Sequence, residues 1–301
     1  MNQQFLTELK AVTAENRIFT DEPMKKHTTF RVGGPADILV QPKGTELAAV
    51  IRLCRKYDVP YQVIGNGSNL LVGDRGIRGL VIEMLSKEDE ICVEDDCITV
   101  GAGMLLSKTA NRAAEHGLTG MEFAAGIPGS IGGAVVMNAG AYGGELKDVL
   151  ESVRVMTPDG EVKELKTEEL DLGYRHSCIP ERGYIVLSAR IRLEKGDPEA
   201  IRVRMDELAA KRREKQPLEY PSAGSTFKRP EGYFAGKLIE DAGLRGYQEG
   251  GAQVSEKHCG FVINRDHATA SDIAGLCGTV QKRVYEQFGV KLETEVKMLG
   301  F

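Results

Sequence analysis

The chain has 301 residues, 42% hydrophobic and 28% charged, with a formal net charge of -5. These values are typical of a folded globular protein and exclude a disordered or fibrous chain. Asp and Glu (44) outnumber Lys and Arg (39), so no global positive field attracts a nucleic acid, and we expect no nucleic-acid partner. The six cysteines form no C-x-x-C pair and lack histidines at ligand spacing, so we expect reduced cytosolic thiols, without a disulfide framework or a metal site.

The N-terminal stretch MNQQFLTELKAVTAENR predicts a polar helix and not a signal peptide. No later stretch approaches the ~20 apolar residues that span a bilayer. We therefore expect a cytoplasmic protein without membrane insertion.

Strand and helix patterns alternate in the first third of the chain. Glycines and prolines bracket short apolar runs in residues 25–42, which predicts strands joined by tight turns. Apolar side chains at helical spacing predict a helix over 45–57, and Pro60 closes this pattern before a predicted strand at 61–64.

A second α+β unit follows. Strands are predicted between 78 and 103, and a helix over 105–117 has Gly117 at its end. Residues 152–165 predict a hairpin that turns at Pro-Asp-Gly, and residues 184–193 predict a long strand.

The sequence KGDP at 195–198 marks a predicted domain boundary, and a charged helix over 199–217 follows it and ends at Pro217. The cations between Lys211 and Lys215 suit either a phosphate or, more commonly, solvent near a helix C-terminus. An apolar stripe from Ile273 to Phe288 predicts a helix that packs on the core.

Two glycine-rich segments stand out: GNGSNLLV at 65–72 and EFAAGIPGSIGGAVVMNAGAYGG at 122–144. Glycine lets backbone N–H groups approach a ligand closely, so such segments can hold a diphosphate, although glycine-rich loops are often only turns. GNGSNL and GAGMLL lack the third glycine of G-x-G-x-x-G, and no P-loop motif occurs. These absences exclude the Rossmann and P-loop classes of nucleotide site.

Three further segments carry candidate chemistry. Ser225 in AGSTFKRP has no G-x-S-x-G elbow, so a nucleophile is not predicted, and a loop serine is the default interpretation. Arg175 in DLGYRHSCIP can clamp a carboxylate through two hydrogen bonds. Glu293 and Glu295 lie in VKLETEVKMLG near the C-terminus. Each of these is commonplace by itself.

Taken in order, these segments resemble the UDP-N-acetylmuramate dehydrogenase family, also called UDP-N-acetylenolpyruvoylglucosamine reductase, of bacterial peptidoglycan synthesis. The resemblance runs through TTFRVGGPA, GNGSNLLV, AGIPGSIGGAVVMNAGAYGGE, YRHSCIP, AGSTFKRP, AGKLIEDAGLRG, GGAQVSEKHCGFVIN and LETEVKMLG, which covers nearly the whole chain. The chain is similar to the compact subclass, because it lacks a tyrosine-bearing loop between the segments of Arg175 and Ser225. Tyr220 is the candidate substitute for that tyrosine.

The resemblance implies an α+β flavoenzyme with non-covalent FAD. It implies an FAD-binding domain of the vanillyl-alcohol-oxidase (PCMH) type over 1–196, with subdomains of about 1–85 and 86–196, and a smaller α+β substrate-binding domain over 197–301. The implied FAD contacts fall in both glycine-rich segments: Gly65, Asn66, Gly67, Ser68, Asn69, Gly126, Pro128, Gly129, Ser130, Ile131, Gly132 and Gly133.

The resemblance also implies the reaction. NADPH reduces the flavin, which then delivers hydride to C3 of UDP-N-acetylglucosamine enolpyruvate, giving UDP-N-acetylmuramate. Arg175 and Glu295 match the family residues that stabilise the enol-like intermediate, and Ser225 matches the one that protonates C2. Lys228 is a candidate for lowering the proton affinity of the serine.

The implied substrate contacts are Gln253 and Lys257, with Tyr174 and Lys237 as weaker candidates. Two alternatives stay open at this point: another FAD-dependent oxidoreductase of the same fold, and a non-catalytic module that binds a nucleotide sugar. Bound flavin and its reoxidation by the enolpyruvyl substrate distinguish them. The preference for NADPH over NADH and the absence of membrane insertion are part of this expectation, whereas the sequence predicts no oligomeric state.

Overall fold

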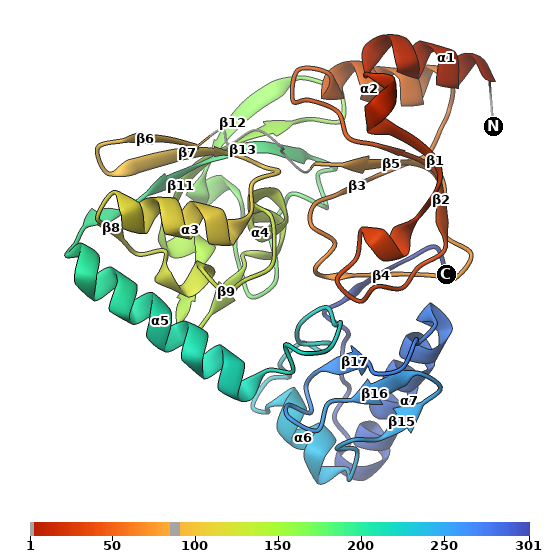
Figure 1. Cartoon of the computed structure of the whole chain (residues 1–301), viewed down its shortest axis with the longest axis vertical. Helices are drawn as coiled ribbons and strands as arrows, with labels where there is room; N and C mark the ends of the chain where they lie inside the picture. Colours follow the sequence, from red (N-terminus) through yellow and green to blue (C-terminus); the bar gives the residue numbers. More distant parts are fainter. Residues whose placement is uncertain (1–2, 85–90) are drawn as a thin grey trace. The chain divides into compact units, whose positions relative to one another are not determined.

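The computed structural model describes residues 3–84 and 91–301 (Figure 1). The chain forms two compact units, each built from separate stretches. The first unit comprises 1–19, 39–66 and 80–212, and the second comprises 20–38, 67–79 and 213–301. The expected continuous domains, 1–196 and 197–301, stay a prediction, and the expected subdomain boundary near 85 and 86 lies outside the described residues.

The first unit contains a five-stranded sheet of order β12-β11-β13-β7-β6, whose neighbouring strands all pair antiparallel. Its strands are β6 (Ile91–Glu94), β7 (Cys97–Gly101), β11 (Leu150–Met156), β12 (Val162–Lys166) and β13 (Ile185–Arg192). The expected hairpin is confirmed: β11 and β12 are joined through Pro158-Asp159-Gly160, with Gly160 at φ +85°. Glycine takes this left-handed conformation without a steric penalty, which fits it to the turn.

Helices α3 (Leu106–Glu115) and α4 (Ile131–Met137) lie on one side of this sheet in Figure 1, and α4 packs against β13 and β7. Helix α1 (Gln3–Val12) packs against α2 (Leu47–Lys56). The expected helices near 3–12, 45–57 and 105–117 are thereby confirmed. Short paired strands complete this unit: β8 (Leu118–Thr119) with β14 (Glu194–Lys195), and β9 (Gly140–Ala141) with β10 (Gly144–Glu145).

A four-stranded sheet has the order β1-β2-β5-β3, made of β1 (Ile18–Pro23), β2 (Pro35–Val40), β3 (Tyr61–Ile64) and β5 (Ile77–Glu83). Strands β3 and β5 pair in parallel, and β3 is the strand expected after Pro60. The chain also has short 3-10 helices: η1 (Glu15–Arg17), η2 (Met24–Lys26), η3 (Glu122–Ala124), η4 (Leu146–Asp148) and η5 (Thr167–Glu169).

The second unit packs α6 (Ala235–Asp241) and α7 (Ala270–Phe288) with an antiparallel sheet of order β15-β16-β17. These strands are β15 (Gln248–Glu249), β16 (Ala252–Val254) and β17 (Val262–Asn264), and β4 (Leu70–Val72) pairs in parallel with β18 (Lys297–Leu299). The predicted apolar stripe of α7 is confirmed, because its buried residues include Ile273, Leu276, Cys277, Val280 and Val284.

Helix α5 (Pro198–Lys215) confirms the charged helix predicted after the KGDP boundary. Its residues up to Arg212 belong to the first unit. Ile201 and Leu208 are the buried residues of this helix, so most of its surface remains polar and solvated. Among the helices of residues 3–84 and 91–301, none combines the length and apolarity needed to cross a membrane.

Candidate functional site

The two glycine-rich segments meet within the first unit. Asn66 follows β3, and its side-chain amide donates to the Pro128 carbonyl at 2.5 Å. A Cβ built on Gly65 would collide with the Ser130 hydroxyl oxygen. The contact therefore requires glycine at position 65, and two segments far apart in sequence form one cradle.

Two amides in the second segment are occupied by the protein itself. The N–H groups of Ile131 and Gly132 donate to the carbonyls of Met104 and Ala102, each at 2.8 Å. These bonds hold the first turn of α4 in place. Ile131 and Gly132 can therefore contact a ligand only through other atoms.

Ser130 caps α4, and its hydroxyl accepts from the Gly133 N–H at 3.4 Å. Within residues 3–84 and 91–301, no hydrogen bond has the N–H of Gly126, Gly129 or Ser130 as its donor. Of these three residues, Ser130 contacts Gly65. Unoccupied main-chain amides next to glycine are what an anionic oxygen needs.

The remainder of the first segment belongs to the second unit. Gly67 has φ +59°, and a Cβ there would collide with the His27 carbonyl oxygen. Farther along, the Asn69 side-chain amide donates to the Glu295 carbonyl at 3.1 Å, and the Lys297 N–H donates to the Asn69 carbonyl at 2.9 Å. The end of the first glycine-rich segment, at Asn69, is therefore hydrogen-bonded to the stretch that carries Glu295.

Ser225 and Glu295 are brought close together in the second unit, although they are far apart in sequence. The Glu295 N–H donates to the Thr226 carbonyl, and the Lys228 N–H donates to the Glu293 carbonyl, both at 2.8 Å. The two stretches therefore run antiparallel, which places Ser225 and Glu295 at the same end of the pairing.

Hydrogen bonds of the neighbouring Thr226 hold the backbone at Ser225 in place. The Thr226 side chain is 1% exposed, and its hydroxyl accepts from the Val262 N–H at 2.9 Å. The Thr226 N–H donates to the Gly260 carbonyl at 2.8 Å. These bonds tie the residue after Ser225 to β17, while Ser225 itself stays partly exposed.

Arg175 lies at the tip of a tight hairpin in the first unit. Gly173 and His176 exchange two backbone hydrogen bonds of 3.2 Å, which leaves Tyr174 and Arg175 as the two turn residues. Arg175 has φ +55°, a left-handed conformation that costs a residue with a Cβ roughly 1–2 kcal/mol. Its guanidinium lies 5.3 Å from the centre of the Tyr174 ring. Arg175 is partly buried, and backbone strain at such a polar turn residue makes it a candidate for function.

This hairpin is attached to the end of α4 by Asn138, which the sequence analysis did not single out. Asn138 is 1% exposed at φ +41°, and its side-chain amide donates to the Gly173 carbonyl at 3.2 Å. Ser177 adds a 2.8 Å bond from its hydroxyl to the Val136 carbonyl. The sequence signal that could have identified Asn138 is its place inside a glycine-rich stretch, because asparagine tolerates the left-handed conformation better than most residues with a side chain.

The structure thus places the cradle at one end of α4 and Arg175 near the other. A helix of seven residues spans about 10 Å, which is short enough for one elongated ligand to reach both ends. Ser225 and Glu295 belong to the second unit.

The four expected substrate contacts differ in exposure. Tyr174 is 56% exposed, whereas Gln253 in β16 is 9% exposed and donates to a backbone carbonyl at 3.2 Å. The Lys257 ammonium donates to the Arg213 carbonyl at 2.7 Å. Lys237 forms an ion pair with Asp241, one turn later in α6. Its side chain is more exposed than those of Gln253 and Lys257, the other two expected contacts in the second unit.

Two secondary candidates have partners of their own. The Lys228 ammonium lies 3.1 Å from the Glu293 carboxylate, in a pair that is 36% and 73% exposed. The Tyr220 ring lies 4.6 Å from the Arg265 guanidinium and lines a hollow of about 580 Å³. The roles expected for Lys228 and Tyr220 stay predictions.

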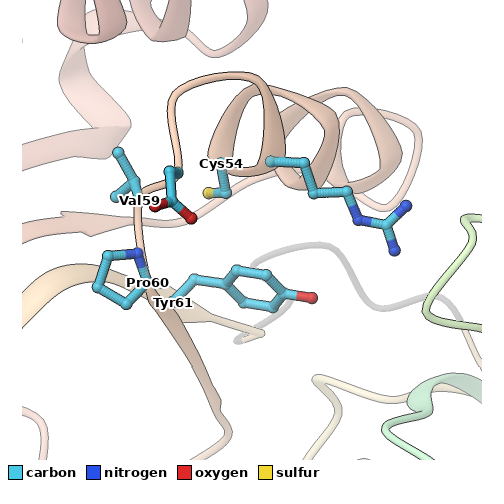
Figure 2. Close-up of a pocket in the computed structure, with 6 residues that line it drawn as sticks. Cys54, Val59, Pro60 and Tyr61 are labelled. Atoms are coloured by element: carbon cyan, nitrogen blue, oxygen red, sulfur yellow. The ribbon is translucent and has the colours of Figure 1, made fainter.

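A separate hollow of about 550 Å³ lies between the end of α2 and the start of β3, as Figure 2 shows. Its lining includes Cys54, Pro60 and Tyr61. Burial raises the pKa of the Cys54 thiol to about 12, so the sulfur is protonated at neutral pH and is a poor nucleophile.

The cysteines are free thiols, and Cys92 is the exposed one. In the part of the chain that the structure describes, no group of three or more His, Cys, Asp or Glu side chains is arranged to hold a metal ion. The candidate groups are therefore main-chain amides and Arg175 in the first unit, and Ser225 and Glu295 in the second.

Comparison with known families defines the class of protein. Residues 36–166 match the family model described as "FAD binding domain". Residues 216–299 match "UDP-N-acetylenolpyruvoylglucosamine reductase, C-terminal domain". The chain is thus an oxidoreductase with an FAD-binding domain of α+β fold, which confirms the expected fold class.

Whole-chain relatives give the family. A UDP-N-acetylenolpyruvoylglucosamine reductase of Agathobacter rectalis is 59% identical over 100% of this chain and 99% of its own length. The crystal structure of UDP-N-acetylenolpyruvylglucosamine reductase (MurB) from Thermus caldophilus is 40% identical, covers 92% of this chain and 97% of its own, and has a TM-score of 0.79. The chain belongs to the UDP-N-acetylenolpyruvoylglucosamine reductase family, as the sequence motifs predicted.

A more distant likeness concerns the fold alone. A grass pollen allergen with glucose dehydrogenase activity is 14% identical, with a TM-score of 0.51, and the match covers 64% of this chain and 44% of the allergen. The match shows that other oxidoreductases share this architecture, and it carries no information about substrate.

Proposed function

We propose that the protein reduces UDP-N-acetylglucosamine enolpyruvate to UDP-N-acetylmuramate with NADPH through FAD, as a cytoplasmic step of peptidoglycan precursor synthesis. The observation that carries the proposal is the antiparallel pairing of residues 226–228 with 293–295, which places Ser225 beside Glu295. This pairing occurs in a chain that is 59% identical to a named reductase over its whole length.

The glycine-rich cradle suits the diphosphate of FAD. Positions 65 and 67 have no room for a Cβ, and the amides of Gly126, Gly129 and Ser130 have no acceptor among the described residues. These main-chain groups, with the stretch from Gly65 to Asn69, would hold the diphosphate. When bound, FAD would supply two-electron transfer from NADPH to the enolpyruvyl double bond.

The protein's side chains have separate tasks in this proposal. Arg175 would bind the substrate carboxylate, since a guanidinium forms two parallel hydrogen bonds to it. Glu295 would stabilise the enol-like form of the substrate. Ser225 would donate a proton to C2. An aliphatic hydroxyl is a very weak acid, so it can protonate only a strongly basic carbon of the kind that forms at C2.

The role of Ser225 is tested with Ser225→Ala. We expect the flavin to be reduced by NADPH at nearly the wild-type rate and to be reoxidised by the enolpyruvyl substrate ~10²–10⁴-fold more slowly, because only the second step needs the acid. Stopped-flow flavin absorbance measures both steps.

The matched control is Ser222→Ala, which removes a hydroxyl from the same loop three positions earlier. It should leave both steps unchanged. Equal slowing of the two steps in Ser225→Ala would show that the serine supports the fold or the coenzyme and does not act as the acid.

A further inference from the structure

Arg212 differs from its neighbours near the end of α5. The helix ends in the charged run Lys211 to Lys215, and Arg212 is half-buried while the other four side chains of this run are exposed. An arginine is seldom buried without a reason, because desolvating a cation is costly.

The guanidinium of Arg212 packs directly on the second glycine-rich segment, within the first unit. A Cβ on Gly126 would lie 2.9 Å from Nη1, 3.1 Å from Cδ and 3.7 Å from Cζ of Arg212. Glycine at position 126 therefore makes room for the guanidinium. The backbone N–H of Gly126 is also one of the three donors without an acceptor in the described chain.

Among the residues that the structure describes, no carboxylate compensates this charge. Across residues 3–84 and 91–301, no ion pair joins an acidic side chain to Arg212. Burial lowers the pKa of the Arg212 guanidinium, with Tyr142 opposing this effect, yet a guanidinium remains charged at neutral pH. A half-buried cation beside the Gly126 N–H, which has no acceptor among the described residues, fits an anionic ligand that both would contact.

We propose that Arg212 binds a phosphate oxygen of the dinucleotide coenzyme, together with the main-chain donors of residues 126–130. This inference rests on the proposed function, because it needs FAD in the glycine-rich cradle. It assigns a coenzyme-binding role to one cation of a run that otherwise faces solvent.

The experiment compares FAD with riboflavin, which has the same ring system and no phosphate. Dissociation constants are measured by flavin fluorescence for protein stripped of its coenzyme. Arg212→Met keeps the aliphatic stem and removes the charge, and we expect it to weaken FAD binding about 10- to 100-fold while changing riboflavin binding less than about twofold. Arg213→Met, the exposed neighbour, is the matched control and should bind both like wild type.

Unchanged FAD affinity in Arg212→Met, or equal losses for FAD and riboflavin, would overturn the inference. If the methionine variant does not fold, Arg212→Lys decides by the same comparison: a loss confined to FAD supports the phosphate contact, and equal effects on both ligands overturn it. Wild-type protein that binds no FAD would instead overturn the proposed function, and the inference with it.

Discussion

At the scale of single residues, Arg175 is one of the non-glycine residues with a left-handed backbone. Its φ of +55° is easy for glycine and unfavourable for any residue with a Cβ. We expect Arg175→Gly to be about 1 kcal/mol more stable than Arg175→Ala, while both variants lose reoxidation by substrate. Urea unfolding measures the free-energy difference. Equal stability of the two variants would contradict strain at this position.

Gly67 illustrates a position where no side chain fits. Gly67 has a φ of +59°, and a Cβ built on it would collide with the His27 carbonyl oxygen. We expect Gly67→Ala to lower the unfolding free energy by more than about 1 kcal/mol and to weaken FAD binding, because the loop must shift. Gly44→Ala is the control: nothing lies within 4 Å of its Cβ position, so it should be neutral or slightly stabilising. Two near-neutral variants would refute the close packing.

At the scale of elements, the start of α7 depends on a carboxylate from a distant stretch of the same unit. Asp74 accepts hydrogen bonds from the Ala270 N–H at 2.8 Å, the Ser271 N–H at 2.9 Å and the Ser271 hydroxyl at 2.6 Å. Burial opposes ionisation, but these bonds outweigh it and hold the pKa of Asp74 below its ordinary value of 3.8.

Because the folded pKa of Asp74 is lowered, its stabilising effect is present above the ordinary value and is lost as pH falls through the folded pKa. Asp74→Asn should therefore be less stable than wild type near neutral pH, and the gap should narrow as pH falls below 3.8. Thermal unfolding across this range measures it, with Glu181→Gln as a surface control. A gap that stays constant with pH would exclude this linkage.

The helices show what the sequence can and cannot predict. Apolar periodicity predicted α7, because its buried side chains recur every three or four residues. Helix α4 was not predicted from the sequence, because Gly132 and Gly133 occupy its first turn and lower its helix propensity. The sequence therefore presented 126–133 as one ligand loop, whereas the structure separates unoccupied amides before the helix from amides inside it that bond to the protein.

Arg212 is a candidate site residue that the sequence alone could not single out. A run of cations gives no sign of which member is buried, because that depends on a tertiary contact with Gly126. The catalytic candidates were identified by resemblance to a family and not by any local pattern. Their closeness arises from long-range backbone pairing, as between Ser225 and Glu295, which has no periodicity in the sequence.

At the scale of the whole molecule, the two compact units alternate along the chain. The pairing of β18 with β4 brings residues 297–299 next to residues 70–72, so the C-terminal end completes a structure begun near the N-terminus. Composition and linker signals report only local changes along the sequence, and the continuous domains expected at 1–196 and 197–301 stay a prediction. We expect that removing residues 297–301 destabilises the second unit, because β4 then loses its partner strand; thermal unfolding measures this, and an unchanged midpoint would contradict it.

We propose that the glycine-rich cradle holds a flavin that links NADPH to an enolpyruvyl sugar nucleotide. It is tested most directly by following the visible flavin absorbance of the purified protein without oxygen. NADPH should bleach the absorbance, and UDP-N-acetylglucosamine enolpyruvate should restore it with formation of UDP-N-acetylmuramate. Protein without flavin absorbance, or bleached flavin that the enolpyruvyl substrate does not reoxidise, would contradict the account.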